Sequence, residues 1–143
     1  MLTDEDLEES CDRLKIPLVG IFSKDLLPKH CIPGGYIINL QNHDEGHGSH
    51  WVALAVRADS ALYFDSFGMP PPLQVIRFVR DDYTLVYNKQ DIQNIDSGVC
   101  GSYCLAFLYY ILVRDGSLRL FQHLFSPDPR KNRGILQDIL APL

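Results

Sequence analysis

The sequence has little cysteine, no long apolar run and no excess of positive charge, and each of these shortages excludes a class of protein. Its four cysteines are too few for the disulfide framework of a small secreted scaffold, and no secretory leader pattern opens the chain. The most apolar stretch, 104–113, has about half the length of a membrane-spanning helix. We therefore expect a protein of a reducing, intracellular compartment with no membrane segment.

The charge balance argues against nucleic acid as a partner, because a formal net charge of −5 at pH 7 does not attract phosphate backbones. The composition, 46% hydrophobic and 22% charged, is typical of a folded globular protein, and the sequence contains no internal repeat. A length of 143 residues fits one domain. We predict a single domain over residues 1–143, which we expect to be a monomer that needs no cofactor or metal.

Hydrophobic periodicity predicts a mixed order of helices and strands. The predicted helices are an N-terminal one that starts at a Thr3 cap and ends before Pro17, then 73–80, 100–114, 117–125 and 134–140. The predicted strands are 36–40, 50–56, 61–65 and 83–87. The helix from Cys100 is apolar on every side, which indicates a buried central helix. The pattern therefore predicts an α+β fold, with a small mixed sheet packed on that helix and flanking helices around it.

Cys100 is the first candidate for chemistry, because a Gly-containing turn delivers it to the start of the buried helix. A thiol at a helix N-terminus lies at the positive end of the helix dipole, beside unpaired N–H groups. Both features favour the thiolate, and the same N–H groups can hold an oxyanion. The alternative is an inert core thiol, which is the commonest environment of a free cysteine.

A nucleophilic thiolate needs an imidazole, and His50 is the best placed of the five histidines. It opens an apolar strand, where its alternative role is structural. His43 and His47 lie instead in a polar, Gly-rich loop, whose side chains we expect to be exposed to solvent. His50 is therefore the predicted partner of the thiol.

Asp65 is the predicted acceptor that orients the imidazole. If the hairpin turn has two residues, Arg57 pairs with Ser60, and Asp65 becomes a diagonal neighbour of His50 on the same face of the sheet. A three-residue turn would move Asp65 to the opposite face. The alternative for Asp65 is an acid that hydrogen-bonds only to its own turn.

Gln93 is the candidate side-chain donor for the oxyanion, because its amide is neutral and lies seven positions before Cys100. Gln90 and Asn94 are equally suitable by chemistry alone. The residues by themselves therefore leave this assignment open.

Short motifs in a fixed order carry a resemblance to a known family. They are Tyr36-Ile37-Ile38-Asn39, a Gly-rich loop, His50-Trp51, Tyr63-Phe64-Asp65-Ser66-Phe67-Gly68, Gln93 and Cys100-Gly101-Ser102-Tyr103-Cys104. Together they resemble the adenovirus protease (adenain) group of cysteine peptidases, whose wider clan includes the SUMO-deconjugating proteases. The resemblance implies a papain-like or adenain-like cysteine protease fold whose central helix starts at the catalytic cysteine.

The resemblance also implies a role for each candidate residue. The implied roles are nucleophile for Cys100, general base and then acid for His50, orienting acid for Asp65, oxyanion hole for Gln93 with the Cys100 N–H, and substrate binding for Trp51 and Gly101. The implied reaction is endopeptidase cleavage of viral or virus-like precursor proteins at Gly-containing sites, through a thioester. Its implied location is the host cytoplasm or nucleus, or the virion.

Some features of the sequence favour the viral branch of the clan over the SUMO-removing branch. SUMO-removing relatives usually carry Asp before the nucleophile and a shorter Gln-to-Cys spacing, whereas this chain has Val99 and the longer viral spacing. Asp65 replaces the Glu common in adenoviral enzymes, and the chain is shorter. The acidic pI of about 5.4 speaks against the DNA cofactor of that family, and nothing in the sequence supports an activating peptide.

Two other functions remain as alternatives. One is a deconjugating isopeptidase for a ubiquitin-like modifier of the SUMO type, which would use the same residues. The other is a metal-binding module, because acids and imidazoles cluster within a few residues and two cysteines are available to join them: His43, Asp44, Glu45, His47, His50, Cys100 and Cys104. The absence of Cys-x₂-Cys spacing argues against the metal module.

Overall fold

The computed structural model describes residues 2–44, 50–93 and 99–143. Its helices are α1 (Asp4–Arg13), α2 (Leu73–Val79), α3 (Cys100–Leu108), which continues as a π-helical turn (Tyr109–Val113), α4 (Leu118–His123) and α5 (Asn132–Ile139). Its strands are β1 (Leu18–Ser23), β2 (Gly34–Asn39), β3 (Trp51–Arg57), β4 (Ser60–Phe64) and β5 (Thr84–Tyr87). Short 3₁₀ turns cover Lys24–Leu26, Arg80–Asp82 and Pro129–Lys131.

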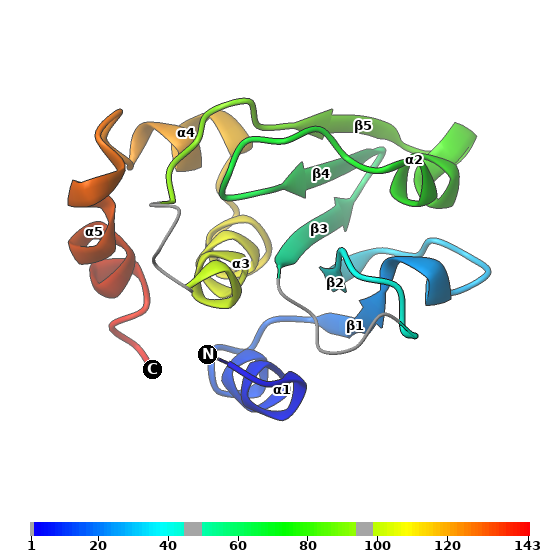
Figure 1. Cartoon of the computed structure of the whole chain (residues 1–143), viewed down its shortest axis with the longest axis horizontal. Coiled ribbons are helices and arrows are strands. Elements are labelled where there is room, and N and C mark those ends of the chain that lie inside the picture. Colours follow the sequence, from blue (N-terminus) through cyan, green and yellow to red (C-terminus); the bar gives the residue numbers. More distant parts are fainter. Residues whose placement is uncertain (1, 45–49, 94–98) are drawn as a thin grey trace.

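The five strands form one mixed sheet in the order β1-β2-β3-β4-β5. The central strands β2, β3 and β4 are antiparallel, whereas the edge strands β1 and β5 run parallel to their neighbours. Figure 1 shows α3 beside β3 and β4 in the middle of the molecule, with α1, α4 and α5 around it. The predicted α+β architecture, a small mixed sheet packed on a buried central helix, is confirmed.

Both faces of the sheet are covered, because side chains of β2, β3 and β4 alternate between two hydrophobic clusters. Ala53, Ala55 and Phe64 pack towards α3, and the Phe64 ring stacks on Phe107 of that helix. The opposite face packs under α2, with Val75 fully buried. This two-sided burial fixes the position of β3 against α3.

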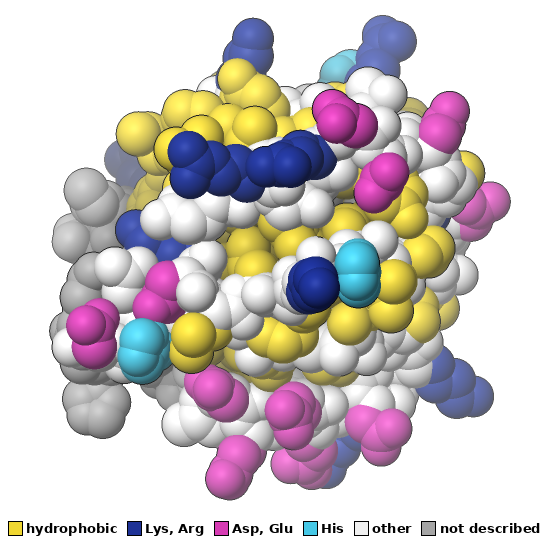
Figure 2. Space-filling model, turned by 90° about the vertical axis from the view of Figure 1, so that its right-hand side faces the viewer, with side chains coloured by type: hydrophobic (Ala, Val, Ile, Leu, Met, Phe, Trp, Pro, Cys, Tyr) yellow, Lys and Arg dark blue, Asp and Glu magenta, His cyan; other side chains and the backbone are white. Residues whose placement is uncertain are grey.

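The N-terminal helix forms as the sequence predicts. Thr3 and Asp6 exchange side-chain and backbone hydrogen bonds as a capping box, and Leu7 and Cys11 are buried against the core. The acids of α1 lie outside and account for the negative lower part of the face in Figure 2: Asp4, Glu5, Asp6, Glu8, Glu9 and Asp12. Six of the 18 acidic residues of the chain therefore lie on α1.

Strand β1 is the element that the sequence pattern does not predict. It is a short apolar run broken by Gly20, where an irregularity in the pairing with β2 occurs. A Cβ atom on Gly20 would come within 2.6 Å of the Phe22 ring, so the glycine makes room for that side chain. Of the helices in the described ranges, none combines the length and apolarity needed to cross a membrane.

Candidate active site

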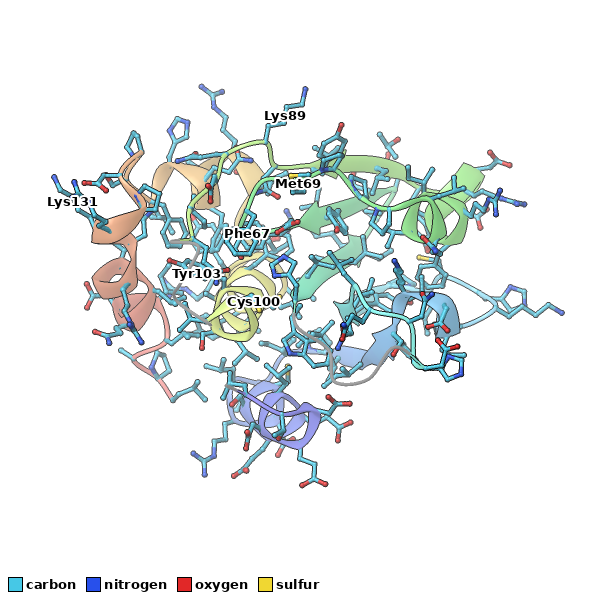
Figure 3. The ribbon with its side chains drawn as sticks, in the orientation of Figure 1. Phe67, Met69, Lys89, Cys100, Tyr103 and Lys131 are labelled. Atoms are coloured by element: carbon cyan, nitrogen blue, oxygen red, sulfur yellow. The ribbon has the colours of Figure 1, made fainter. Side chains whose placement is uncertain are left out.

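Cys100 is the first residue of α3, and its side chain is buried at the junction with β3. The Trp51 backbone N–H donates a hydrogen bond to Cys100 Sγ at 3.4 Å. Val99, at the N-cap, provides no capping side chain, so α3 begins with backbone N–H groups close to the thiol. Figure 3 shows Cys100 at the near end of α3, with Phe67 on the loop above it.

His50 lies immediately before β3, and its carbonyl accepts the Leu40 N–H at 3.0 Å. This bond continues the β2–β3 ladder to the histidine and fixes its backbone. His50 Nε2 lies 2.7 Å from Asp65 Oδ1. The Phe67 ring packs on the imidazole with 4.8 Å between ring centroids, so the ring is held on one side by an aromatic face and at one end by a carboxylate.

The hairpin between β3 and β4 has the register that brings Asp65 to His50. Arg57 pairs with Ser60 and Ala53 with Phe64, as the two-residue turn predicts. Asp65 follows β4 directly and is 1% exposed. Its Oδ1 also accepts the Phe67 N–H at 2.9 Å, so the carboxylate is fixed by its own turn as well as by the imidazole.

The electrostatics favour a charged Cys100–His50 pair. Burial works against the Cys100 thiolate, but hydrogen bonding to His50 and to the Trp51 N–H, together with the His50 charge, lowers the pKa of the thiol below its ordinary value. Burial also works against protonated His50, but its hydrogen bonds to Asp65 and Cys100 raise the pKa of the imidazole to about 9. Both shifts therefore favour the thiolate–imidazolium form of the pair over the neutral form.

The other three cysteines show the opposite behaviour. Burial raises the pKa of Cys11 to about 12 and that of Cys31 to about 11. Cys104, one helical turn after Cys100, is fully enclosed, and burial raises its pKa well above the ordinary value. Cys100 is thus the cysteine of this chain whose environment favours the thiolate, and all four thiols are free of disulfides.

Gln93 is buried and lies beside the Asp65 turn, where its N–H donates to the Ser66 carbonyl at 3.0 Å. The Ser66 hydroxyl donates to Gln93 Oε1. The preceding Ile92 carbonyl accepts hydrogen bonds from the Tyr103 hydroxyl at 3.3 Å and from Asn132 Nδ2 at 3.1 Å. Because Tyr103 belongs to α3, these bonds anchor the Gln93 segment to the helix that carries Cys100.

Trp51 is buried and lines a pocket of about 540 Å³ together with Ile21, Phe22, Asn39 and His43, among others. Cys100, His50, Asp65 and Gln93 are not among the described residues that line this pocket. Gly101 is buried at the start of α3, where a Cβ atom would lie 3.3 Å from a Leu7 methyl. Its lack of a side chain lets α1 pack closely, and its role in substrate binding stays a prediction.

Among the described residues, the candidate metal ligands are divided between two places. Asp25, His43 and Asp44 form an exposed group, in which His43 is bonded to the Asp25 carboxylate through its ring and its N–H. His50 is bonded to Asp65 instead. Glu45 and His47 lie outside the described residues, as does the rival donor Asn94.

Three residues that contact the catalytic candidates were not singled out by sequence. Phe67 and Ser66 are described above. Asn88 is the third: its Oδ1 accepts the Asp65 N–H at 2.9 Å and its Nδ2 donates to the Asp65 carbonyl at 2.7 Å. Ser66 and Phe67 belong to the motif that follows Asp65, so the sequence could have indicated them. Asn88 has no sequence signal other than being a polar residue after a strand.

Comparisons with known proteins bear on the fold. No family model and no curated protein matches the sequence. A crystal structure of the pS273R protease of African swine fever virus (ASFV) matches with a TM-score of 0.67 and 20% identity, over 98% of this chain and 66% of that chain. A second structure of the same protease matches with a TM-score of 0.52 and 21% identity, over 74% and 43% of the two chains.

A structure of the SUMO protease Ulp1 with an oxidised catalytic cysteine matches with a TM-score of 0.42 and 18% identity, over 75% of this chain and 52% of that chain. The chain thus spans 43% to 66% of the length of these solved proteins. The fold is that of the ASFV protease, which lies in the clan expected from the sequence, while adenovirus protease itself is not shown by these structures.

Proposed function

We propose that this chain is a cysteine endopeptidase that cleaves viral or virus-like precursor proteins at Gly-containing sites. One observation carries the proposal: the His50 imidazole is bonded to the Asp65 carboxylate and to the Cys100 thiol, and the pKa of that thiol is lowered. A chain of acid, imidazole and thiol is the arrangement that activates a nucleophile for acyl transfer. The shared fold with the ASFV protease supports it.

Each group has a definite task in the reaction. The Cys100 thiolate attacks the peptide carbonyl carbon, and the oxyanion is held by the Gln93 amide and the Cys100 N–H. Protonated His50 gives its proton to the leaving amine, which leaves a thioester on Cys100. His50 then takes a proton from water as that water attacks the thioester, and Asp65 keeps the imidazole oriented throughout. No cofactor enters these steps.

The substrate side of the proposal rests on Trp51. Its backbone N–H donates to the nucleophile, and the same residue lines the pocket that the strands β1 and β2 border, so Trp51 links the thiol to a surface where a substrate can bind. The preference for Gly next to the scissile bond is proposed on the resemblance to the adenain group, which implies that Trp51 walls the passage for substrate glycines. An intracellular or virion location remains part of the same proposal.

The test is a peptide library with Gly at varied positions, incubated with the chain and read by mass spectrometry. We expect cleavage after Gly, and no cleavage by Cys100→Ala at the same concentration. Ubiquitin-like modifiers with reactive C-termini serve as a second arm. Labelling of Cys100 by one modifier, without peptide cleavage, would favour the isopeptidase. If the protein is folded and Cys100 is reactive but no peptide of the library is cleaved, the endopeptidase proposal is overturned.

A further inference from the structure

The Asp65-Ser66 dipeptide contacts both halves of the candidate site. The Asp65 carboxylate holds His50, while the Ser66 hydroxyl donates to Gln93 Oε1. The Ser66 carbonyl accepts the N–H groups of Ile92 at 2.9 Å and Gln93 at 3.0 Å. Ser66 is 2% exposed, so these contacts are shielded from water. One turn therefore fixes the base and the segment that carries the oxyanion donor.

The direction of the Ser66 hydrogen bond matters because a glutamine amide has two ends of similar shape and opposite polarity. Only the NH₂ end can donate to an oxyanion, and the carbonyl end would repel it. A hydroxyl that donates to Oε1 secures the carbonyl end at Ser66 and turns the NH₂ end away from it. In this structure the carbonyl end of the amide is the one at Ser66, and burial makes the loss of that hydrogen bond costly.

The turn itself is rigid. Asn88 clamps both backbone groups of Asp65, and the Gly68 N–H donates to the Asp65 carbonyl at 2.8 Å. Gly68 has a φ of +73°, and a Cβ atom there would come within 2.8 Å of the Lys89 carbonyl oxygen, so glycine is required at that position. The Ser66 hydroxyl is consequently presented to Gln93 from a fixed backbone.

We propose that Ser66 is a positioning residue, whose hydroxyl sets the orientation of the Gln93 amide so that its NH₂ end serves the oxyanion. This inference rests on the proposed function and deepens it. Ser66 touches neither the nucleophile nor the reacting carbonyl in this scheme, and it acts only through Gln93.

The experiment compares Ser66→Ala, Gln93→Ala and the double variant in peptide cleavage. We expect Ser66→Ala to lower kcat by about 10- to 100-fold, less than full loss of an oxyanion donor, with KM within about twofold. In the Gln93→Ala background, Ser66→Ala should cause no further loss, because the group it positions is absent. Losses that multiply in the double variant, or an unchanged kcat in Ser66→Ala, would overturn the inference.

Two controls separate positioning from a general structural role. Iodoacetamide alkylation of Cys100 forms no oxyanion, so its rate in Ser66→Ala should equal that of the parent chain. Ser117→Ala removes another serine hydrogen bond, the cap of α4 to the Leu120 N–H, and should lower the melting temperature with kcat unchanged. An alkylation rate that falls with kcat in Ser66→Ala would contradict the inference.

A second readout keeps this inference separate from the peptidase proposal. In a ¹⁵N-labelled sample, the Gln93 side-chain NH₂ signals are identified by their loss in Gln93→Ala. Ser66→Ala should shift these signals towards those of a solvent-exposed glutamine even if the chain cleaves no peptide. If the signals shift but no peptide is cleaved, only the peptidase proposal is refuted. If the signals do not shift, the role of Ser66 is refuted.

Discussion

The two ends of the packed pair β3 and α3 are secured by different chemistry. At one end the Trp51 N–H donates a single bond to the Cys100 sulfur, beside His50. At the other end the Arg57 guanidinium, at the end of β3, donates to the Ile111 carbonyl at 2.8 Å and to the Gly116 carbonyl. A cation at the C-terminal end of a helix stabilises its exposed carbonyls, whereas a thiol at the N-terminal end gains reactivity.

The difference teaches how one helix serves both stability and chemistry. The carbonyls at the C-terminal end accept hydrogen bonds from a charged side chain, so this end contributes stability. At the N-terminal end the donor is the neutral Trp51 N–H, and Cys100 and His50 form a titratable pair. The positive end of the helix dipole is therefore available to stabilise the thiolate. Changes at the two ends should therefore separate activity from stability.

The largest effect is expected at the nucleophile. Cys100→Ala should lower kcat/KM for a Gly-containing peptide by at least about 10³-fold, because no other group can form the thioester. Activity assays and thermal unfolding measure the two consequences, and the melting temperature should change little. Cys104→Ala is the matched control: it empties buried volume one turn later, so it should lower the melting temperature and leave kcat intact. Equal loss of kcat in both variants would contradict the assignment.

The next effect concerns the oxyanion donor. Gln93→Ala should lower kcat by about 10²- to 10³-fold, the usual cost of one oxyanion-hole donor, and leave the alkylation rate of Cys100 unchanged. Steady-state kinetics checks this. Gln90→Ala serves as the control, because the Gln90 carbonyl that accepts from Asn88 belongs to the backbone and survives the change. A similar loss in Gln90→Ala would show that the loop, and not the amide, is responsible.

The parts of this site that sequence predicts are those set by local rules. The two-residue turn fixes the register from Arg57 to Ser60, and with it the side of the sheet on which Asp65 meets His50. The all-round apolar pattern places the helix from Cys100 in the centre. Short-range geometry was sufficient for these residues because turn length and helix period leave few alternatives.

The parts that sequence does not predict depend on distant pairing. Strand β1 is recognisable only through its parallel partner β2, since its own run is short and broken by glycine. The bonds of Asn88 to Asp65, and of Ser66 to Gln93, join residues 23 and 27 positions apart. A polar side chain in a loop has many partners available to it, and only the folded chain selects one.

A smaller effect is expected from pH, with its sign set by the two shifted groups. Alkylation of Cys100 should begin at a lower pH than that of an ordinary thiol, whose pKa is about 8.5, while Cys11, Cys31 and Cys104 stay unreactive. Peptide cleavage should rise as the thiol ionises and fall as His50 loses its proton near pH 9, since neutral imidazole cannot protonate the leaving amine.

Mass spectrometry of the four cysteines after limiting iodoacetamide, over pH 5 to 9, measures this profile. His50→Ala should move the onset for Cys100 to higher pH, because burial then acts on the thiolate without its partner. An unchanged onset in His50→Ala would mean that the imidazole does not stabilise the thiolate. Identical profiles for all four cysteines would remove the distinction between the ends of α3.

The smallest effect on chemistry is expected at the opposite end. Arg57→Ala leaves the Ile111 and Gly116 carbonyls without their charged donor, so the free energy of unfolding should fall by about 1 to 3 kcal/mol, measured by urea denaturation. Asp115→Asn removes only the partner of an exposed ion pair and should cost less than about 1 kcal/mol. In both variants the folded protein should keep the alkylation profile of Cys100, because the helix N-terminus is unaltered. A shifted profile in Arg57→Ala would mean that the ends are coupled through α3, and that stability and reactivity cannot be changed independently in this fold.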